Sequence, residues 1–286
     1  MNVGGDTMRF GGNLIAKWNS PEEWAQLNVR DGYSGVYFPL DHTAKTADID
    51  AYVSAAKEHD LVICEIGIWN NLLDPDESRR QVNFTRAVHQ LELADYAGAN
   101  CCVNIAGSYN PDCWDGCHAD NFTHRAFDEI VEISQRIIDA AQPKRTFYTL
   151  EPMPNMYPDT ADSYLELIRA IDRSQFGAHI DIVNIISSPR AYYGNTAVIN
   201  EWFDKLAPYV RCCHAKDSII RDRLTVHLDE CRPGTGNIDY DTYLKRVNEL
   251  PDKNVCLMLE HMSEAEDYRL ATEFIKAKAE KLGIKL

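Results

Sequence analysis

The sequence predicts a single (β/α)8 barrel, a TIM barrel of the α/β class, that spans residues 1–286 as one domain. Short apolar runs with β-propensity alternate with longer segments of helical periodicity, and the number of such pairs reaches eight. The runs are almost continuously apolar, as parallel strands covered on both faces should be. No linker rich in Pro, Gly or Ser interrupts the alternation, and closed α/β barrels commonly have this length.

The elements follow one another in a regular order. Strands are expected at 9–14, 35–40, 61–67, 101–106, 146–153, 177–183, 210–215 and 255–260. Helices are expected at 21–28, 49–59, 79–97, 127–141, 161–172, 198–206, 240–250 and 265–282. Capping residues mark several helix starts: Ser20 before Pro21, Asp159 or Thr160 before the fifth helix, and Ser263 before the last. The connections 107–123 and 218–239 are long and follow strands, which predicts either lids at the catalytic face or plain surface insertions.

Composition narrows the classes of function. The formal net charge of −15 argues against nucleic acid or an anionic membrane as partner, because both require clustered Lys and Arg. A cation or a small polar substrate fits better, although acidity also serves solubility alone. No apolar run approaches the roughly 18 residues of a membrane span, and the N-terminus lacks a signal pattern, so a cytoplasmic protein is expected. The nine cysteines, with adjacent pairs at 101–102 and 212–213, are expected to be reduced packing residues.

Potential metal ligands stand at the ends of four consecutive predicted strands: Glu151, Asp181, His214 and Glu260. A carboxylate placed directly after a buried strand is costly unless it is paired or binds a metal. Neighbouring strands of a closed barrel end at the same pole, so these side chains can converge on one ion. Three carboxylates and one imidazole suit Mn²⁺, Mg²⁺ or Co²⁺, and we favour Mn²⁺.

At these four positions the chain resembles the xylose isomerase-like superfamily of TIM barrels, in particular the sugar phosphate isomerase/epimerase and ketose 3-epimerase group. The segments 151–155, 214–217 and 233–240 also match sequence motifs of that group. The resemblance implies that Glu151, Asp181, His214 and Glu260 bind one divalent ion and that Glu151 and Glu260 also move protons. It further implies a small carbohydrate substrate, and dimers or tetramers are frequent in the group, which leaves a homo-oligomer open.

The resemblance implies a sugar isomerase or epimerase that acts on a keto sugar or related keto acid through a metal-stabilised enediolate. Where ketose 3-epimerases carry substrate-contacting Glu, His and Arg, however, this chain has Tyr157, Asn184 and Ile220. The segments 188–193 and 114–116 look more like a branch with keto-acid decarboxylases and keto-sugar lyases. A metal-dependent lyase or decarboxylase that uses the same enediolate is therefore the alternative. Phosphodiester cleavage, as in endonuclease IV-like relatives, and a catalytically inactive binding barrel remain further classes.

Other residues are candidates for substrate binding. Lys216 and Asp217, just beyond His214, are expected to hold substrate oxygens, and an ordinary ion pair at the rim is the alternative. Asn184 belongs with them because it occupies a substrate-contact position of the epimerases. Glu65 and Trp69 end the third strand on the same face, where a structural role is equally open. Further candidates are the lid residue Trp114 and two anchors for a carboxylate or phosphate, Arg190 and Arg232. His118 and His261 receive no role.

Overall fold

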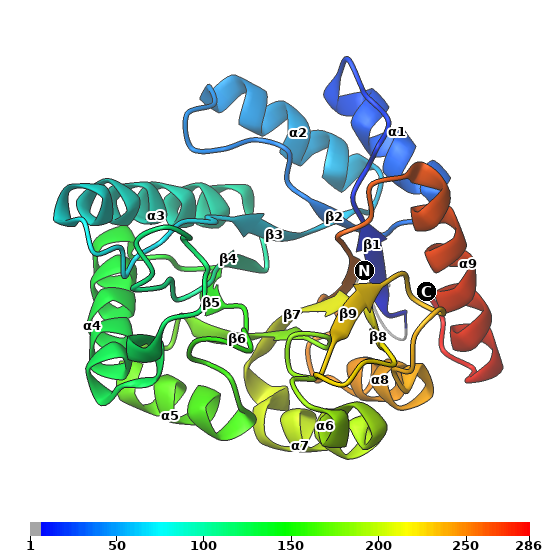
Figure 1. Cartoon of the computed structure of the whole chain (residues 1–286). Helices are drawn as coiled ribbons and strands as arrows, with labels where there is room; N and C mark the ends of the chain where they lie inside the picture. The colour runs from blue at the N-terminus through cyan, green and yellow to red at the C-terminus, as the bar shows by residue number, and fades with distance from the viewer. Residues whose placement is uncertain (1–6) are drawn as a thin grey trace.

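The computed structural model describes residues 7–286, which form a closed barrel of eight parallel strands surrounded by helices (Figure 1). The strands are β1 (Arg9–Gly12), β2 (Gly35–Tyr37), β3 (Val62–Gly67), β4 (Cys101–Asn104), β5 (Phe147–Leu150), β6 (Phe176–Asp181), β7 (Val210–Ala215) and β10 (Cys256–Leu259). β10 pairs with β1 and closes the barrel. The predicted fold class is confirmed, and each predicted strand overlaps an observed one.

Helices follow the strands and cover the outside of the barrel (Figure 1). They are α1 (Pro21–Asp31), α2 (Thr46–Glu58), α3 (Glu77–Ala97), α4 (His124–Ala141), α5 (Ala161–Ile171), α6 (Pro189–Tyr193), α7 (Asn195–Leu206), α8 (Tyr240–Asn248) and α9 (Ala265–Lys281). Ser20 caps α1 and Thr160 caps α5, where Thr160 and Ser163 form a reciprocal capping box. The predicted cap Ser263 is wrong, because Glu264 occupies the N-cap of α9 and makes no side-chain cap hydrogen bond.

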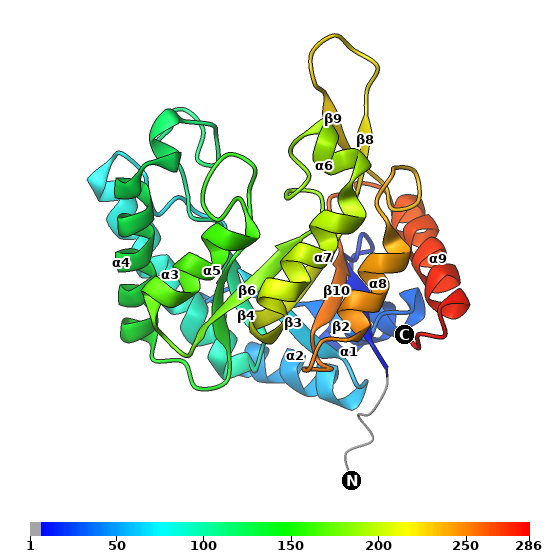
Figure 2. The same cartoon turned by 90° about the horizontal axis from the view of Figure 1, so that it is seen from below.

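Both long connections rise on the side of the barrel where the strands end. The first contains a short 3-10 helix, η1 (Ala119–Phe122). The second forms an antiparallel hairpin of β8 (Asp217–Ile220) and β9 (Leu228–Cys231), which the sequence did not predict. Figure 2 shows the hairpin projecting beyond the barrel. A second 3-10 helix, η2 (Ala207–Tyr209), leads into β7.

The barrel interior is filled by a small cluster that is separate from the main core between strands and helices. It contains Cys64, Cys101, Cys212, Cys256 and Met258. These residues come from strands around the barrel and contact one another, so they lie inside it. Cys64 and Cys256 form a disulfide, whereas the other seven cysteines are free. The expectation of reduced cysteines is therefore wrong for this pair, because barrel closure brings together residues that lie 192 positions apart.

Candidate metal centre

The four predicted ligands converge at the end of the barrel where the strands finish. Asp181 and His214 are register partners on β6 and β7, and His214 pairs with Met258, two residues before Glu260. Glu151 directly follows β5, and its amide donates to the carbonyl of Asn104. One ligand atom from each of Glu151, Asp181, His214 and Glu260 lies within 4.8 Å of the others.

The four side chains are almost fully buried, with relative exposures of 0% for Asp181 and His214, 5% for Glu151 and 7% for Glu260. Two tyrosines of α8 fix the strand end below them, because Tyr243 Oη donates to the carbonyl of His214 and Tyr240 Oη to that of Lys216. Buried charges at this density require opposite charges or a metal. The barrel therefore holds these charged side chains out of contact with solvent, so water does not screen their charges.

Lys216 supplies one of those opposite charges. Its Nζ lies 2.6 Å from Asp181 Oδ2 and 2.6 Å from Glu260 Oε1, and its side chain is buried. His214 Nδ1 lies 2.9 Å from Glu260 Oε1 and 3.5 Å from Asp181 Oδ2. The sequence placed Lys216 at the site as a substrate contact, and the structure places it directly against two of the candidate ligands.

The electrostatics separate the carboxylates. Burial raises the pKa of Glu151 to about 7. The charges of Glu260 and Asp181 also raise this pKa, whereas His214 lowers it. Burial would also raise the pKa of Asp181, but Lys216 and His214 outweigh it and hold that pKa well below its usual value. For Glu260, burial is likewise outweighed by His214 and Lys216, so its pKa is lowered. Glu151 is thus the carboxyl group that can exchange a proton near neutral pH.

The donor set fits a divalent ion. Within residues 7–286, Asp181 Oδ2, His214 Nδ1 and Glu260 Oε1 are buried without a hydrogen bond of acceptable geometry. Three of the four ligands offer oxygen and one offers nitrogen, the set that Mg²⁺ or Mn²⁺ accepts. With Lys216 in place, the three carboxylates keep a net negative charge that a divalent ion would neutralise. These buried groups could therefore hold a metal ion.

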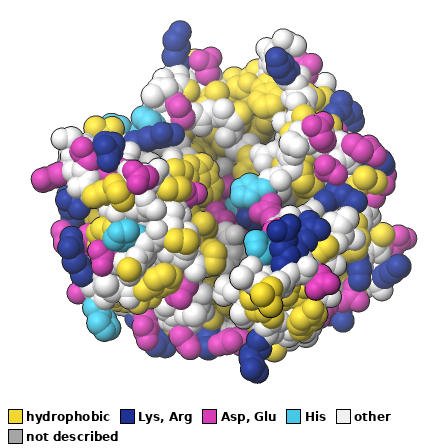
Figure 3. Space-filling model, viewed as in Figure 1, with side chains coloured by type: hydrophobic (Ala, Val, Ile, Leu, Met, Phe, Trp, Pro, Cys, Tyr) yellow, Lys and Arg dark blue, Asp and Glu magenta, His cyan; other side chains and the backbone are white. Residues whose placement is uncertain are grey.

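A cavity of about 660 Å³ opens above the ligands, and the face drawn in Figure 3 is hollowed at its centre, where acidic and histidine side chains gather. Predicted site residues that line it are Glu65, Trp69, Trp114, Glu151, Asn184 and Glu260. Trp69 and Trp114 are partly exposed, at 40% and 42%, and offer flat apolar surfaces to a ligand. The cavity also contains Arg86 and His261, to which the sequence gave no role.

Asn184 and Glu65 line the cavity but also contact the candidate ligands. Asn184 Nδ2 donates to Glu151 Oε1 at 2.8 Å, and its backbone amide donates to Asp181 Oδ1. Glu65 Oε2 lies 3.2 Å from His214 Nε2 and 3.1 Å from His179 Nε2. His179 was not predicted from the sequence, although strand alternation places His179 and Asp181, two residues apart, on the same face of β6.

The structure does not bring Asp217, Arg190 and Arg232 into the cavity. The Asp217 carboxylate accepts hydrogen bonds from the amides of Ser218, Gly234, Gly236 and Ile238, and so braces the loop after β9. Arg232 pairs with Asp267 at 3.3 Å. Arg190 lies on the exposed side of α6. Their predicted substrate contacts therefore have no support in the geometry, because Asp217 and Arg232 bind other partners and Arg190 is exposed.

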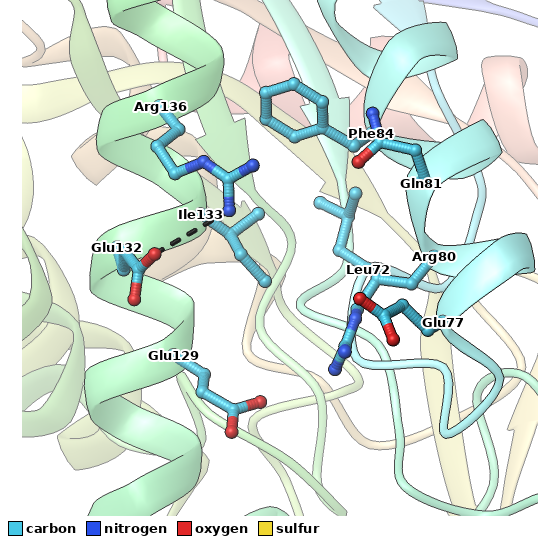
Figure 4. A pocket seen from close by; sticks show the side chains of 9 residues that line it. All are labelled: Leu72, Glu77, Arg80, Gln81, Phe84, Glu129, Glu132, Ile133 and Arg136. Carbon is cyan, nitrogen blue, oxygen red and sulfur yellow. Dashed lines mark ion pairs between the residues drawn. The ribbon is translucent and has the colours of Figure 1, made fainter.

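A smaller cavity of about 300 Å³ lies between α3 and α4 (Figure 4). One of its arginines, Arg136, pairs with Glu132 at 3.6 Å and lies 4.7 Å above the ring of Phe84. The clusters of metal-ligating side chains found in residues 7–286 all lie elsewhere. We therefore place the functional site at the barrel mouth.

The fold and the site together define a TIM barrel whose mouth carries a buried set of carboxylates and one histidine that could hold a divalent ion. The chain belongs to the xylose isomerase-like TIM barrel family, whose model matches residues 26–278. The resemblance stated from the sequence is confirmed. No curated protein gives a significant match.

Solved structures share the fold at low sequence identity. A xylose isomerase-like TIM barrel protein from Mycobacterium smegmatis, in complex with magnesium, has a TM-score of 0.68 and 17% identity over 96% of this chain and 97% of that chain. The 3-keto-D-glucoside 4-epimerase of E. coli has a TM-score of 0.65 and 15% identity, covering 95% and 100%. A probable 3-DHS dehydratase involved in petrobactin synthesis, from Bacillus anthracis, has a TM-score of 0.68 and 17% identity, covering 91% and 94%.

Within residues 7–286, every helix is too short or too polar to span a bilayer.

Proposed function

We propose that this protein is a divalent-metal-dependent isomerase or epimerase that acts on a keto sugar or a related keto acid at the barrel mouth. The observation that carries the proposal is the buried convergence of Glu151, Asp181, His214 and Glu260 below an open cavity. Solved neighbours with the same fold include an epimerase of keto sugars and a protein in complex with magnesium, which supports this class of chemistry. Mn²⁺ is our preferred ion, with Mg²⁺ and Co²⁺ as alternatives.

Glu151 is the proposed general base. Its carboxylate faces the cavity where the carbon next to a substrate carbonyl would lie. Glu151 then carries the proton that it removes and can return it to the adjacent carbon, while Glu260, whose pKa is lowered, starts ionised and is the proposed base for the opposite face. A bound divalent ion would supply the positive charge that stabilises the enediolate between these two proton transfers. Asn184 keeps Glu151 oriented, since its amide donates to Glu151 Oε1 at 2.8 Å.

The cavity walls support a carbohydrate substrate. Trp69 and Trp114 offer aromatic faces to the C–H groups of a sugar, while Arg86 and His261 add hydrogen-bond donors. Among the described residues that line this cavity, Arg86 is the one with a Lys or Arg side chain. We therefore propose Arg86, in place of Arg190 and Arg232, as the contact for an acidic group on a substrate.

A metal-dependent lyase or decarboxylase is the second candidate. Asn184 is committed to Glu151, and Ile220 lies on the hairpin strand β8, so two positions that contact ketose in the epimerases carry different chemistry here. The probable dehydratase among the solved neighbours supports this candidate. Both candidates require the same carboxylates and the same ion.

The test is incubation of the Mn²⁺-loaded protein with a panel of keto sugars and keto acids, followed by mass spectrometry and NMR. An unchanged mass with altered stereochemistry or altered carbonyl position supports isomerisation, whereas loss of CO₂, water or a fragment supports the lyase. Glu151→Gln should lower either activity by at least about 100-fold, because it removes the base. Asp95→Asn is the matched control, since Asp95 binds backbone amides at the opposite pole of the barrel. Full activity of Glu151→Gln would contradict the proposed mechanism.

A further inference from the structure

Directly below the candidate ligands, the barrel interior contains a second polar group made of Glu65, His179 and His214. These residues come from β3, β6 and β7, and their exposures are 2%, 0% and 0%. Both imidazoles direct Nε2 at the same atom, Glu65 Oε2, at 3.1 Å from His179 and 3.2 Å from His214. A buried carboxylate with two imidazole donors is an ordered arrangement with little freedom to rotate.

His214 therefore has two different neighbours on its two nitrogens. Nε2 faces Glu65, while Nδ1 faces Glu260 Oε1 at 2.9 Å, Asp181 Oδ2 at 3.5 Å and Glu151 Oε1 at 3.7 Å. When one imidazole N–H donates a hydrogen bond to a carboxylate, the other nitrogen is left free to bind a metal, and the ring orientation is fixed.

We propose that Glu65, held in place by His179, is a positioning residue that keeps the proton of His214 on Nε2 and aims Nδ1 at the metal ion. This inference rests on the proposed function, because it assigns His214 as a ligand. It changes the role expected for Glu65 from a substrate contact to a support for the ion.

Packing around the network allows this role. The rings of His179 and His214 are 4.2 Å apart at an interplanar angle of 76°, so each ring restricts rotation of the other. Tyr37 packs edgewise against His214 with ring centroids 6.4 Å apart. The His179 amide is itself fixed, since it donates to Tyr164 Oη at 2.9 Å. His214 can therefore tilt little without breaking the contact to Glu65.

The same residues with Cys212 form a second cluster whose ligand atoms lie within 4.8 Å of one another. Binding an ion there would require Nε2 of His179 and Nε2 of His214 to give up their hydrogen bonds to Glu65 Oε2. Cys212 is fully buried and its thiol donates to the carbonyl of Cys256 at 3.8 Å, so it carries its proton. We therefore assign this cluster to positioning, and the experiment below decides between the two roles.

The experiment compares Mn²⁺ binding by wild type, Glu65→Gln, His179→Phe and the control Asp95→Asn, using electron paramagnetic resonance of free Mn²⁺. Wild type should bind one equivalent. Glu65→Gln should weaken binding by about 10–100-fold, as is typical when a carboxylate behind a metal-bound histidine is lost. His179→Phe should weaken it less, because Glu65 keeps its contact to His214. The control should bind as wild type does.

A second measurement reads the tautomer directly. In ¹⁵N-histidine spectra of the Mg²⁺-loaded wild type, His214 should carry its proton on Nε2, and this signal should shift or broaden in Glu65→Gln. Unchanged Mn²⁺ affinity in both variants would overturn the positioning role even if the wild type converts a keto sugar. Two equivalents in the wild type, with one lost in Glu65→Gln, would show a metal site in its place. Absence of Mn²⁺ binding by the wild type would overturn this inference together with the proposed function.

Discussion

At the scale of single residues, Glu151 and Lys216 decide the charge of the site. Glu151 is the carboxyl group whose pKa lies at about 7, because burial and two neighbouring carboxylates oppose its ionisation. Lys216 is a buried cation with two carboxylate oxygens at 2.6 Å. The sequence indicated both positions, since each stands at the end of a predicted strand. It did not indicate which carboxyl group would hold a proton, because that depends on distances between strands.

The Mn²⁺ affinity should depend on pH around neutrality. Below about pH 7 the raised pKa leaves Glu151 protonated, and the pKa of His214 is also raised, because neighbouring carboxylates outweigh its burial. An ion must displace these protons, so affinity should fall as pH decreases from 8 to 6, by up to tenfold per unit for each proton released. Calorimetry in two buffers with different ionisation enthalpies would measure the released protons. A binding enthalpy that is independent of the buffer would contradict this expectation.

Lys216→Met should destabilise the metal-free protein much more than the metal-loaded protein. Removal of the ammonium leaves Asp181 and Glu260 buried without their cation, which should lower the stability of the metal-free protein by about 3–5 kcal/mol. Saturating Mn²⁺ should restore most of that loss, because the ion replaces the missing charge. Denaturant melts with EDTA and with Mn²⁺ would test this. Equal losses in both conditions would show that Lys216 acts by packing alone.

At the scale of elements, the sequence predicted the strands and helices well and the second long connection poorly. Residues 218–239 contain two glycines and several charged residues, which are typical of a loop, yet part of the segment pairs as β8 and β9. Asp217 holds the chain that returns after β9 through the backbone amides of Gly234, Gly236 and Ile238. An added Cβ at Gly236 would overlap the Asp217 carboxylate, so the glycine at this position allows the loop to close against Asp217.

Asp217→Ala should loosen the hairpin without abolishing metal binding. Asp217 is 1% exposed. Loss of its carboxylate leaves buried amides without acceptors, at a cost of about 1–3 kcal/mol for each amide. We expect faster hydrogen exchange in residues 228–240 and a lower melting temperature, with Mn²⁺ affinity within about threefold of wild type. A large loss of affinity would instead place Asp217 in the site.

At the scale of the whole molecule, the candidate ligands join β5, β6, β7 and β10, half of the barrel wall. An ion bound only by the folded arrangement should stabilise the entire barrel. At a free Mn²⁺ concentration of 100 times the dissociation constant, the gain should be about 2.7 kcal/mol.

Thermal melts with Mn²⁺ and with EDTA would measure that gain, and Glu151→Gln should reduce it because one ligand is missing. Asp95→Asn should retain the gain, since Asp95 accepts hydrogen bonds from backbone amides at the opposite pole of the barrel. Equal melting temperatures with and without the ion would contradict a site shared among four strands.

The sequence by itself determined the number and order of the βα units and the side chains that end the last four barrel strands, because apolar runs and helical periodicity are local properties. It also determined the family, through motifs that stay close in sequence. The tertiary structure decided the rest. Glu65 turned out to lie behind His214, Asp217 to brace a loop, and Cys64 to meet Cys256 across the barrel. These roles depend on which buried groups face each other after closure, and partners so far apart in the chain leave no local pattern.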